Sequence, residues 1–281
     1  MSETKRRKRG ADDAAATSTT KPSITLRCIG FCGADDSVEP SLLAAISAQH
    51  SWVEWGVLFR KDKEGLPRYA SSAWLDRLSA ANPQRTMRLA AHLCSCRVDE
   101  LLRGETSFVA RLHDEVGFRR VQINATAANG CDVSVFATDA GAEACVATLR
   151  TACSKLPHIE FIVQRNRQTE PLWSRLTADP PPNMSMLFDD SMGLGVSTTS
   201  WPAPPPMCSP LRFGYAGGLS PSNLAEQLAL IEATAAERSL WVDMESSLRT
   251  TLKNDTDVFD ANKAMACVRI VIEKGLEPLA P

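Results

Sequence analysis

Short apolar segments alternate with amphipathic segments from residue 23 onward, and this alternation constrains the fold more than any other feature of the chain. The apolar segments predict strands at residues 24–32, 52–59, 87–93, 121–124, 159–163, 184–189, 213–216 and 240–244. The amphipathic segments predict helices at residues 40–46, 71–78, 98–102, 108–116, 142–156, 171–176, 223–235 and 262–274. Strands that alternate with helices in this way form parallel sheets.

Eight strand–helix units are the number that closes a parallel barrel, and residues 23–281 come close to the roughly 250 residues typical of one. The competing fold is an open, doubly wound sheet, which places a glycine-rich turn directly after an early strand. The first predicted strand instead ends in Cys32-Gly33-Ala34-Asp35, which does not match G-x-G-x-x-G. We therefore predict an α/β protein whose residues 23–281 form a single (β/α)8 TIM barrel.

Residues 1–22 are charged or rich in Ala, Ser and Thr and lack apolar periodicity, so we expect a disordered leader. The basic run Lys5–Arg9 is typical of a nuclear address or a nucleic-acid patch, and equally of a solvated tail without an address. We expect a cytoplasmic protein, with the nucleus as the alternative that this run leaves open. We expect no secretory signal and no membrane partner, because no apolar run reaches the roughly 18 residues that span a bilayer.

Nine cysteines and a balanced charge argue against several other classes of protein. The cysteines are odd in number, form no C-x-x-C pair and do not cluster with the four histidines, so neither zinc nor a disulfide framework is expected. Free thiols in a reducing compartment are the simpler interpretation. The net charge of −2 argues against a protein that binds nucleic acid over its whole surface. The sequence predicts no metal and no cofactor, and it does not determine the oligomeric state.

Cys32 and Asp189 close the first and sixth predicted strands, and barrel enzymes have their active sites at the carboxyl ends of the strands. A thiol and a carboxyl group that face each other there suit a general base and a general acid. The thiol acts as a base only when it is partly ionised, which requires a nearby cation. The alternative interpretation of Cys32 is a buried cysteine that packs as a small apolar residue and does not react. Arg68, in the loop after the second strand, could bind a carboxylate in a bidentate fork or remain solvated.

Gly217 and Gly218 follow the seventh predicted strand, close to where barrels commonly bind phosphate. Glycines let the backbone approach an anion, and the start of the next helix supplies free N–H groups. Gly193 and Gly195 form a second glycine-rich end after the sixth strand. A plain tight turn is the alternative interpretation of Gly217-Gly218. Within a barrel, we expect a small phosphorylated ligand.

Several motifs follow one another in the order shown by one enzyme family. They are Phe31-Cys32-Gly33, Gly56-Val57-Leu58-Phe59, Pro67-Arg68-Tyr69, Val121-Gln122-Ile123-Asn124, Leu187-Phe188-Asp189, Gly193-Leu194-Gly195, Ala216-Gly217-Gly218-Leu219 and residues 242–249. They resemble K-I-C-G, G-F-V-F, S-x-R-[YF], V-Q-L-H, L-L-D, G-[ST]-G, A-G-G-L-x-P-x-N and V-D-V-S-S-G-V-E of phosphoribosylanthranilate isomerase, the barrel enzyme of tryptophan biosynthesis. The resemblance covers nearly everything after the leader. Each motif is weak alone, and their common order makes the resemblance specific.

The resemblance implies an Amadori rearrangement of N-(5-phosphoribosyl)anthranilate, an aminoaldose-to-aminoketose isomerisation by an intramolecular oxidoreductase. Asp189 would be the general acid that opens the ribose ring, and Cys32 the general base that takes the C2′ proton. The implied substrate-binding residues are Arg68, Gln122 and Asp243. The implied phosphate-binding residues are Gly193, Gly195, Gly217, Gly218 and Ser246. No cofactor is implied.

The chain departs from the family pattern mainly in the binding residues. Gly30 replaces a lysine that could help to ionise Cys32, Asn124 replaces a histidine, Ser247 replaces a glycine and Arg249 replaces a glutamate. A proline-rich insert over residues 201–208 could reshape the mouth of the barrel. Two alternatives therefore stay open: a barrel enzyme that acts on another phosphorylated sugar derivative, and a non-catalytic sugar-phosphate-binding or regulatory protein.

Overall fold

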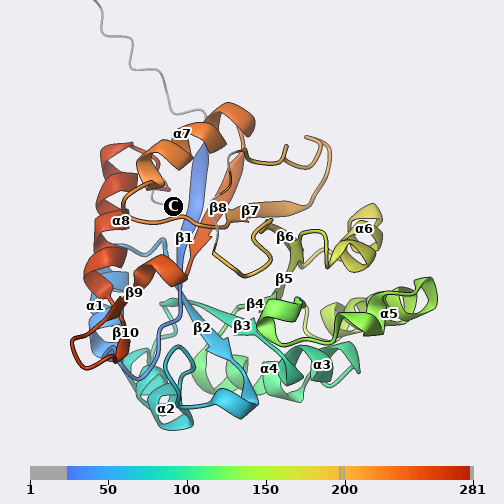
Figure 1. Ribbon diagram of the computed structural model, residues 1–281, viewed down its shortest axis with the longest axis horizontal. Helices are drawn as coiled ribbons and strands as arrows, with labels where there is room; N and C mark the ends of the chain where they lie inside the picture. The colour runs from blue at the N-terminus through green and yellow to red at the C-terminus, as the bar shows by residue number, and fades with distance from the viewer. Residues whose placement is uncertain (1–23, 196–197, 199, 279–281) are drawn as a thin grey trace, which may run out of the picture.

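The computed structural model describes residues 24–195, 198 and 200–278, and its main feature is a closed barrel of eight strands (Figure 1). The strands are β1 (Thr25–Cys32), β2 (Val53–Phe59), β3 (Arg88–Leu93), β4 (Arg120–Ile123), β5 (Glu160–Arg165), β6 (Met184–Phe188), β7 (Arg212–Ala216) and β8 (Ser239–Met244). Each strand pairs in parallel with the next, and β8 pairs in parallel with β1. The predicted α/β barrel is confirmed. The predicted leader, with its basic run, lies outside the described residues.

Helices surround the barrel on its outside (Figure 1). They are α1 (Pro40–Gln49), α2 (Ser72–Ala81), α3 (Cys96–Leu102), α4 (Ser107–Arg111), the π-helical turn η2 (Leu112–Val116), α5 (Asp139–Lys155), α6 (Glu170–Ala178), α7 (Leu224–Thr234) and α8 (Ala261–Glu273), with 3-10 turns η1 (Lys61–Lys63), η3 (Ala127–Asn129), η4 (Val133–Phe136) and η5 (Ser246–Leu248). Pro40 begins α1, and the Ser71 hydroxyl caps α2 by accepting a hydrogen bond from Trp74 N at 3.1 Å. Within the described ranges, no helix is both long and apolar enough to cross a membrane.

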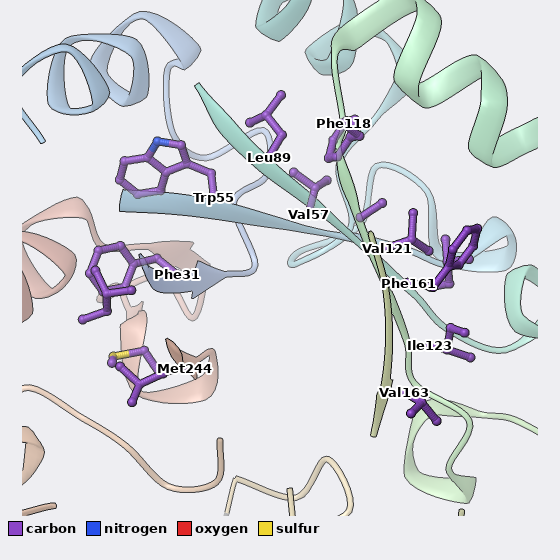
Figure 2. Packing of buried hydrophobic residues seen from close by; sticks show 14 of the residues in the cluster. Phe31, Trp55, Val57, Leu89, Phe118, Val121, Ile123, Phe161, Val163 and Met244 are labelled. Atoms are coloured by element: carbon purple, nitrogen blue, oxygen red, sulfur yellow. The ribbon is translucent and has the colours of Figure 1, made fainter. Parts of the chain in front are cut away.

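Alternate residues of each strand face away from the barrel axis and pack beneath the helices. Figure 2 shows part of this outer core, in which the labelled side chains are Phe31, Trp55, Val57, Leu89, Phe118, Val121, Ile123, Phe161, Val163 and Met244. Burial on both faces of the sheet explains why the strands appear in the sequence as nearly continuous apolar runs. Each fully buried aliphatic or aromatic side chain of this kind stabilises the fold by about 1.5–3 kcal/mol.

The intervening strand residues face the barrel interior, and many of them are polar. Barrel interiors are usually filled by branched aliphatic side chains. Here the buried polar side chains of the inward positions include Glu54, His92, Arg120, Gln122, Gln164, Asp189 and Asp243. Because burying a polar group without a partner is costly, these residues mark the parts of the barrel that have a role beyond packing.

The connection between β6 and β7 contains no helix among its described residues, and the sequence pattern predicts none between residues 189 and 213. The proline-rich insert lies in this connection. Trp201 packs edge-on against Tyr215 with ring centroids 5.3 Å apart, and its Nε1 donates to Oε1 of Gln227 at 3.0 Å. The Tyr215 hydroxyl donates to the carbonyl oxygen of Pro202 at 2.8 Å. The insert therefore covers the outer face of β7 and links it to α7.

An antiparallel hairpin, which the sequence pattern does not predict, follows β8. Its strands are β9 (Arg249–Thr251) and β10 (Asp257–Phe259). The backbone N of Phe259 donates to Oγ of Ser37 at 2.8 Å, and the Phe259 ring lies 6.2 Å from that of Trp55. The hairpin is thus fixed to the segment after β1 and to β2, beside the end of the barrel where the strands finish.

Candidate active site

The carboxyl ends of the strands enclose a cavity of about 100 Å³ at the mouth of the barrel. The predicted site residues that line it are Gln122, Asp189, Gly193, Gly195, Gly217, Gly218, Asp243 and Ser246. Cys32 and Arg68 are not part of its lining. The structure therefore brings most of the predicted residues to one place. The two exceptions are Cys32, the predicted base, and Arg68, the residue predicted to bind a carboxylate of the substrate.

Asp189, directly after β6, is the predicted acid. Its Oδ1 accepts a hydrogen bond from Ser191 Oγ at 2.5 Å, and its Oδ2 accepts one from Gln164 Nε2 at 3.1 Å. Burial raises the pKa of the Asp189 carboxyl group, and hydrogen bonds from Ser191 and Gly193 oppose this only in part. A raised pKa keeps the proton on a carboxyl group closer to neutral pH, which is the requirement for a general acid.

Two glycine-rich loops and the turn after β8 meet on one side of the cavity. Gly217 and Gly218 have φ angles of 117° and 65°, in the region that glycine adopts without strain. A Cβ atom at Gly195 would lie 3.3 Å from Oγ of Ser246, so the loop after β6 contacts the turn after β8. The predicted phosphate-binding positions after three different strands are therefore neighbours.

Two side chains hold the loop after β7 in place. Asn223 donates from Nδ2 to the carbonyl oxygen of Gly218 at 2.9 Å, and its Oδ1 accepts from the backbone N of Ser220 at 2.8 Å. Ser247 donates from Oγ to the carbonyl oxygen of Leu219 at 2.7 Å. Ser247 thus ties the turn after β8 to the loop after β7.

Cys32, the predicted base, is only 1% exposed at the end of β1. Its Sγ lies 3.2 Å from Nδ1 of His92 on β3. Burial, with the charges of Glu245 and Asp243, raises the pKa of the Cys32 thiol well above 9.0. Burial and the charge of Arg120 lower the pKa of His92 to about 3. At neutral pH the contact therefore joins a neutral thiol to a neutral imidazole, and the charges that act most strongly on Cys32 are negative.

Asp243, one residue before the end of β8, lines the cavity and pairs in register with Gly30 of β1. A Cβ atom at Gly30 would overlap Oδ1 of Asp243, so the glycine leaves the space that the carboxylate occupies. Burial, followed by the charge of Glu54, raises the pKa of Asp243 well above 3.8, and Asp189 contributes in the same direction. Gly30 and the buried carboxylate of Asp243 are therefore two parts of one local arrangement.

Arg68 belongs to a group of five charged residues beside the mouth, which we call the ion cluster: Asp35, Arg68, Glu245, Arg249 and Asp257. Nε of Arg68 lies 3.1 Å from Oδ2 of Asp257, and its Nη1 lies 3.3 Å from Oε1 of Glu245. Nη2 of Arg249 lies 2.9 Å from Oδ2 of Asp35, and its Nε lies 3.1 Å from Oδ1 of Asp257. Arg68 is thus paired with two carboxylates, and Arg249 forms the buried centre of the cluster.

Amide side chains complete the wall of the cavity. Gln122 donates from Nε2 to Oδ1 of Asn124 at 2.8 Å, and Asn124 donates from Nδ2 to Sγ of Cys94 at 3.5 Å. Oε1 of Gln164 is buried and has no hydrogen-bond partner within the described part of the chain. A buried acceptor without a partner is costly, so this atom marks a place where a ligand could donate a hydrogen bond.

Comparisons with known proteins bear on the fold. No family model and no curated protein matches the chain. A phospho-2-dehydro-3-deoxyheptonate aldolase from Thermotoga maritima is similar in structure at 11% identity and a TM-score of 0.49, over 91% of this chain and 71% of that one. A phosphoribosyl anthranilate isomerase from Thermococcus kodakaraensis is similar at 11% identity and a TM-score of 0.45, over 87% and 98%. A D-psicose 3-epimerase from Clostridium cellulolyticum H10 is similar at 10% identity and a TM-score of 0.47, over 89% and 100%.

At these identities the likeness extends no further than the barrel, so the chemistry has to be inferred from the chain's own residues. Sequence reasoning missed His92, Gln164, Ser191 and Glu245 of the site. The signal for His92 and Gln164 was available, because each is a polar residue at an inward position of a strand that is otherwise apolar. Among the described residues, no group of three or more His, Cys, Asp and Glu side chains is arranged to hold a metal ion.

Proposed function

We propose that the chain is a barrel enzyme that isomerises a small phosphorylated sugar derivative by acid–base catalysis. The observation that carries the proposal is that Asp189, with its raised pKa, shares one cavity with the glycine loops at Gly195 and Gly217-Gly218. Within this class, the motif order favours the rearrangement of N-(5-phosphoribosyl)anthranilate to its aminoketose. The finer proposal rests on the sequence resemblance, and the coarser one rests on the site.

The phosphate of the substrate binds on the side of the cavity formed by Gly195, Gly217, Gly218 and Ser246. The loop after β7 leads into α7, whose N-terminus favours an anion through its free N–H groups and its dipole. The cavity of about 100 Å³ is smaller than the roughly 300–1,000 Å³ that encloses a whole drug-sized ligand. The phosphorylated sugar end therefore enters the cavity, and the rest of the substrate extends out of the mouth.

A short chain of hydrogen bonds connects the phosphate side to the acid. The backbone N of Gly195 donates to Oγ of Ser191 at 3.2 Å, and Ser191 Oγ donates to Oδ1 of Asp189. This chain fixes the carboxyl group relative to the phosphate, which is the positioning that makes proton transfer efficient. The unpaired Oε1 of Gln164 accepts a hydrogen bond from a sugar hydroxyl or from the substrate amine.

In the proposed reaction, Asp189 gives its proton to the ring oxygen as the bond between that oxygen and C1′ breaks, which leaves a Schiff base. A base then takes the proton from C2′. The electron pair of the broken C2′–H bond forms the double bond between C1′ and C2′, and the electrons of the C=N bond return to the nitrogen, which gives the enol-amine. Protonation at C1′ and loss of the enol proton give the aminoketose. Substrate and product contain the same atoms, so the reaction consumes neither oxidant nor reductant.

Two side chains are candidates for the base that takes the C2′ proton. The family resemblance favours Cys32, whereas the lining of the cavity favours Asp243. We assign this role to Asp243, because Cys32 is buried against His92, and burial with the charges of Glu245 and Asp243 raises the pKa of its thiol well above 9.0, so the thiol stays protonated. Asp189 and Asp243 each have a raised pKa, so one can hold a proton while the other is ionised.

The test is turnover of N-(5-phosphoribosyl)anthranilate by the purified full chain, together with growth of an isomerase-deficient tryptophan auxotroph. Asp189→Asn is expected to lower kcat/KM at least 100-fold, since general acid–base groups contribute roughly 10²- to 10⁴-fold. Asp243→Asn should do the same and Cys32→Ala should not, if Asp243 is the base. Asp190→Asn is the matched control, because this neighbouring carboxylate is exposed.

Loss of activity in Cys32→Ala with activity retained in Asp243→Asn would assign the base to Cys32 instead. Wild-type protein that turns over other phosphorylated aldoses but not this substrate would retain the coarser proposal and reject the finer one. Equal activity in Asp189→Asn and wild type would reject the acid–base mechanism altogether.

A second candidate function is binding of a sugar phosphate without turnover. The observation in its favour is that burial and nearby carboxylates keep the Cys32 thiol protonated, and that Arg68 is already paired with Glu245 and Asp257. For a protein of this kind, ribose 5-phosphate should raise the midpoint temperature of thermal unfolding, because a ligand that binds only the folded state stabilises that state. Stabilisation in wild type and its loss in Ser246→Glu, with no turnover of any phosphorylated aldose, would select this function.

A further inference from the structure

A second pocket lies at the opposite end of the barrel, where the strands begin, with a volume of about 530 Å³. Its wall is dominated by arginine side chains. The charged lining residues are Arg27, Arg88, Arg119, Arg120, Arg212, Glu54 and Glu160. They come from the first residues of several strands and from the segments that lead into them, so none belongs to the candidate active site.

The acidic side chains of this pocket balance only part of its positive charge. Glu160 lies within ion-pair distance of three arginines, with shortest N–O distances of 3.5 Å to Arg27, 3.4 Å to Arg120 and 3.7 Å to Arg212. Burial raises the pKa of Glu160, but Arg120 and Arg27 outweigh it and bring the pKa to about 2. Glu54 pairs with Arg120 at 2.5 Å. Five guanidinium groups thus face two carboxylates, which leaves three positive charges in excess.

Two of the arginines keep buried nitrogens without a hydrogen bond. Nε of Arg120 lies 3.4 Å from Glu160 but makes no hydrogen bond, although the Arg120 side chain is only 9% exposed. Nη1 of Arg27 is buried and makes none with the described residues. Arg88 and Arg119 donate to the carbonyl oxygens of Ser51 and Arg85, which carry no formal charge. Unpaired buried donors and excess like charge both destabilise a fold unless an anion joins them.

We propose that this pocket binds a small phosphorylated anion with at least two negative charges. A guanidinium group matches a phosphate through two parallel N–H bonds, and several arginines around one pocket are the usual way to hold such a group. The volume lies within the roughly 300–1,000 Å³ of small-molecule sites. The site is independent of the proposed function, because it lies at the other end of the barrel.

The indole ring of Trp241 provides an internal reporter for this site. The guanidinium carbon of Arg120 lies 4.3 Å from the ring centroid, and that of Arg27 lies 6.0 Å from it. A ligand that draws these guanidinium groups toward its phosphates changes the charge over the ring. Binding therefore changes the tryptophan fluorescence as well as producing heat.

The experiment is calorimetric titration of the full chain with pyrophosphate, with orthophosphate and citrate as comparison anions. Pyrophosphate is expected to bind more tightly than either, and its affinity should fall as ionic strength rises. Arg88→Ala combined with Arg212→Ala should weaken binding at least tenfold and shift the fluorescence titration to correspondingly higher pyrophosphate concentrations. Both side chains are substantially exposed, so their removal leaves the fold intact. Arg103→Ala, an exposed arginine outside this pocket, is the matched control.

Ser246→Glu separates the two ends of the barrel, because it places a negative charge in the proposed phosphate site at the mouth. Pyrophosphate binding that survives Ser246→Glu and is weakened at least tenfold in the double arginine variant supports the proposal. Binding lost in Ser246→Glu and unchanged in the double variant would overturn it, as would the absence of pyrophosphate binding. Citrate binding as tight as that of pyrophosphate would overturn the preference for phosphate.

Discussion

The thiol of Cys32 and the imidazole of His92 make contact across an intervening strand, and Gly56 of β2 is the residue that allows it. A Cβ atom at Gly56 would lie 2.9 Å from Nε2 of His92 and 3.0 Å from Cβ of Cys32. The glycine therefore lets side chains of β1 and β3 meet inside the barrel at 3.2 Å. The contact is buried and neutral, so its consequences differ from those of a catalytic thiolate–imidazolium pair.

Cys32 should be unreactive toward alkylating agents in the native protein. Burial and nearby carboxylates raise the pKa of its thiol well above 9.0, so little thiolate exists at pH 7.5. Cys208 is exposed and should react fully under the same conditions. Mass spectrometry of the protein after brief treatment with iodoacetamide measures both sites. Rapid labelling of Cys32 before any unfolding would contradict this assignment of a neutral thiol.

His92 should make the protein sensitive to mild acid. Its pKa falls from 6.5 to about 3 on folding, so the unfolded chain binds a proton that the folded protein excludes. The stability that neutral His92 contributes, measured against His92→Asn, is fully present above pH 6.5 and is lost as the pH falls toward 3. The loss should be about 2 kcal/mol by pH 5, at 1.36 kcal/mol per pKa unit. Urea unfolding of both proteins across this range measures it, and parallel pH profiles would show that His92 titrates normally.

Gly30 and Asp243 should be energetically coupled. Gly30→Ala places a Cβ atom against Oδ1 of Asp243 and should destabilise the fold by roughly 1–3 kcal/mol through overpacking. In an Asp243→Ala background the same change should cost much less, because the overlapping atoms are gone. A double-mutant cycle from chemical denaturation gives the coupling energy. Equal costs in the two backgrounds would mean that the overlap is relieved elsewhere.

Arg249 should be required for stability rather than for binding at the mouth. Its side chain is 3% exposed between Asp35 and Asp257, and Arg249→Glu removes the cation beside the buried Asp35 and places a further carboxylate against it, whereas Asp257 keeps its pair with Arg68. The expected loss is roughly 3–5 kcal/mol, the usual effect of removing one partner of a buried ion pair. Arg249→Lys keeps the charge and should lose less.

Arg111→Ala is the matched comparison for Arg249, because its ion pair with Glu115 is exposed and spans 4.0 Å. Exposed pairs contribute roughly 0–1 kcal/mol, so this variant should unfold almost as the wild type does. Comparable losses in Arg111→Ala and Arg249→Glu would show that the ion cluster is no more important than an ordinary surface pair.

The barrel could be predicted from the sequence because its strands are buried on both faces. All eight predicted strands are present with boundaries within two residues, from the first at Thr25–Cys32 to the last at Ser239–Met244. The helices after most strands were also predictable from their apolar periodicity. The insert at residues 201–208 has no such periodicity, and its packing on Tyr215 depends on an aromatic contact that no local pattern encodes.

The candidate site was only partly predictable, because its contacts join residues far apart in the chain. Strand ends located Asp189 and the glycine loops, which line the cavity. The partner of Cys32 is 60 residues away, and Arg249 donates to the carbonyl oxygen of Gly33, 216 residues away. Neither contact leaves a local sequence signal.

The insert between β6 and β7 also gives the barrel one place where the chain can be interrupted. Met207 is 72% exposed, and the neighbouring turn lies outside every strand and helix. Exposed turns of this kind are the usual sites of proteolytic nicking and tolerated insertion. A peptide tag inserted after Met207, or a cut at that bond, leaves all eight strands whole. The two resulting pieces would carry β1–β6 and β7–β8, each retaining part of the candidate site.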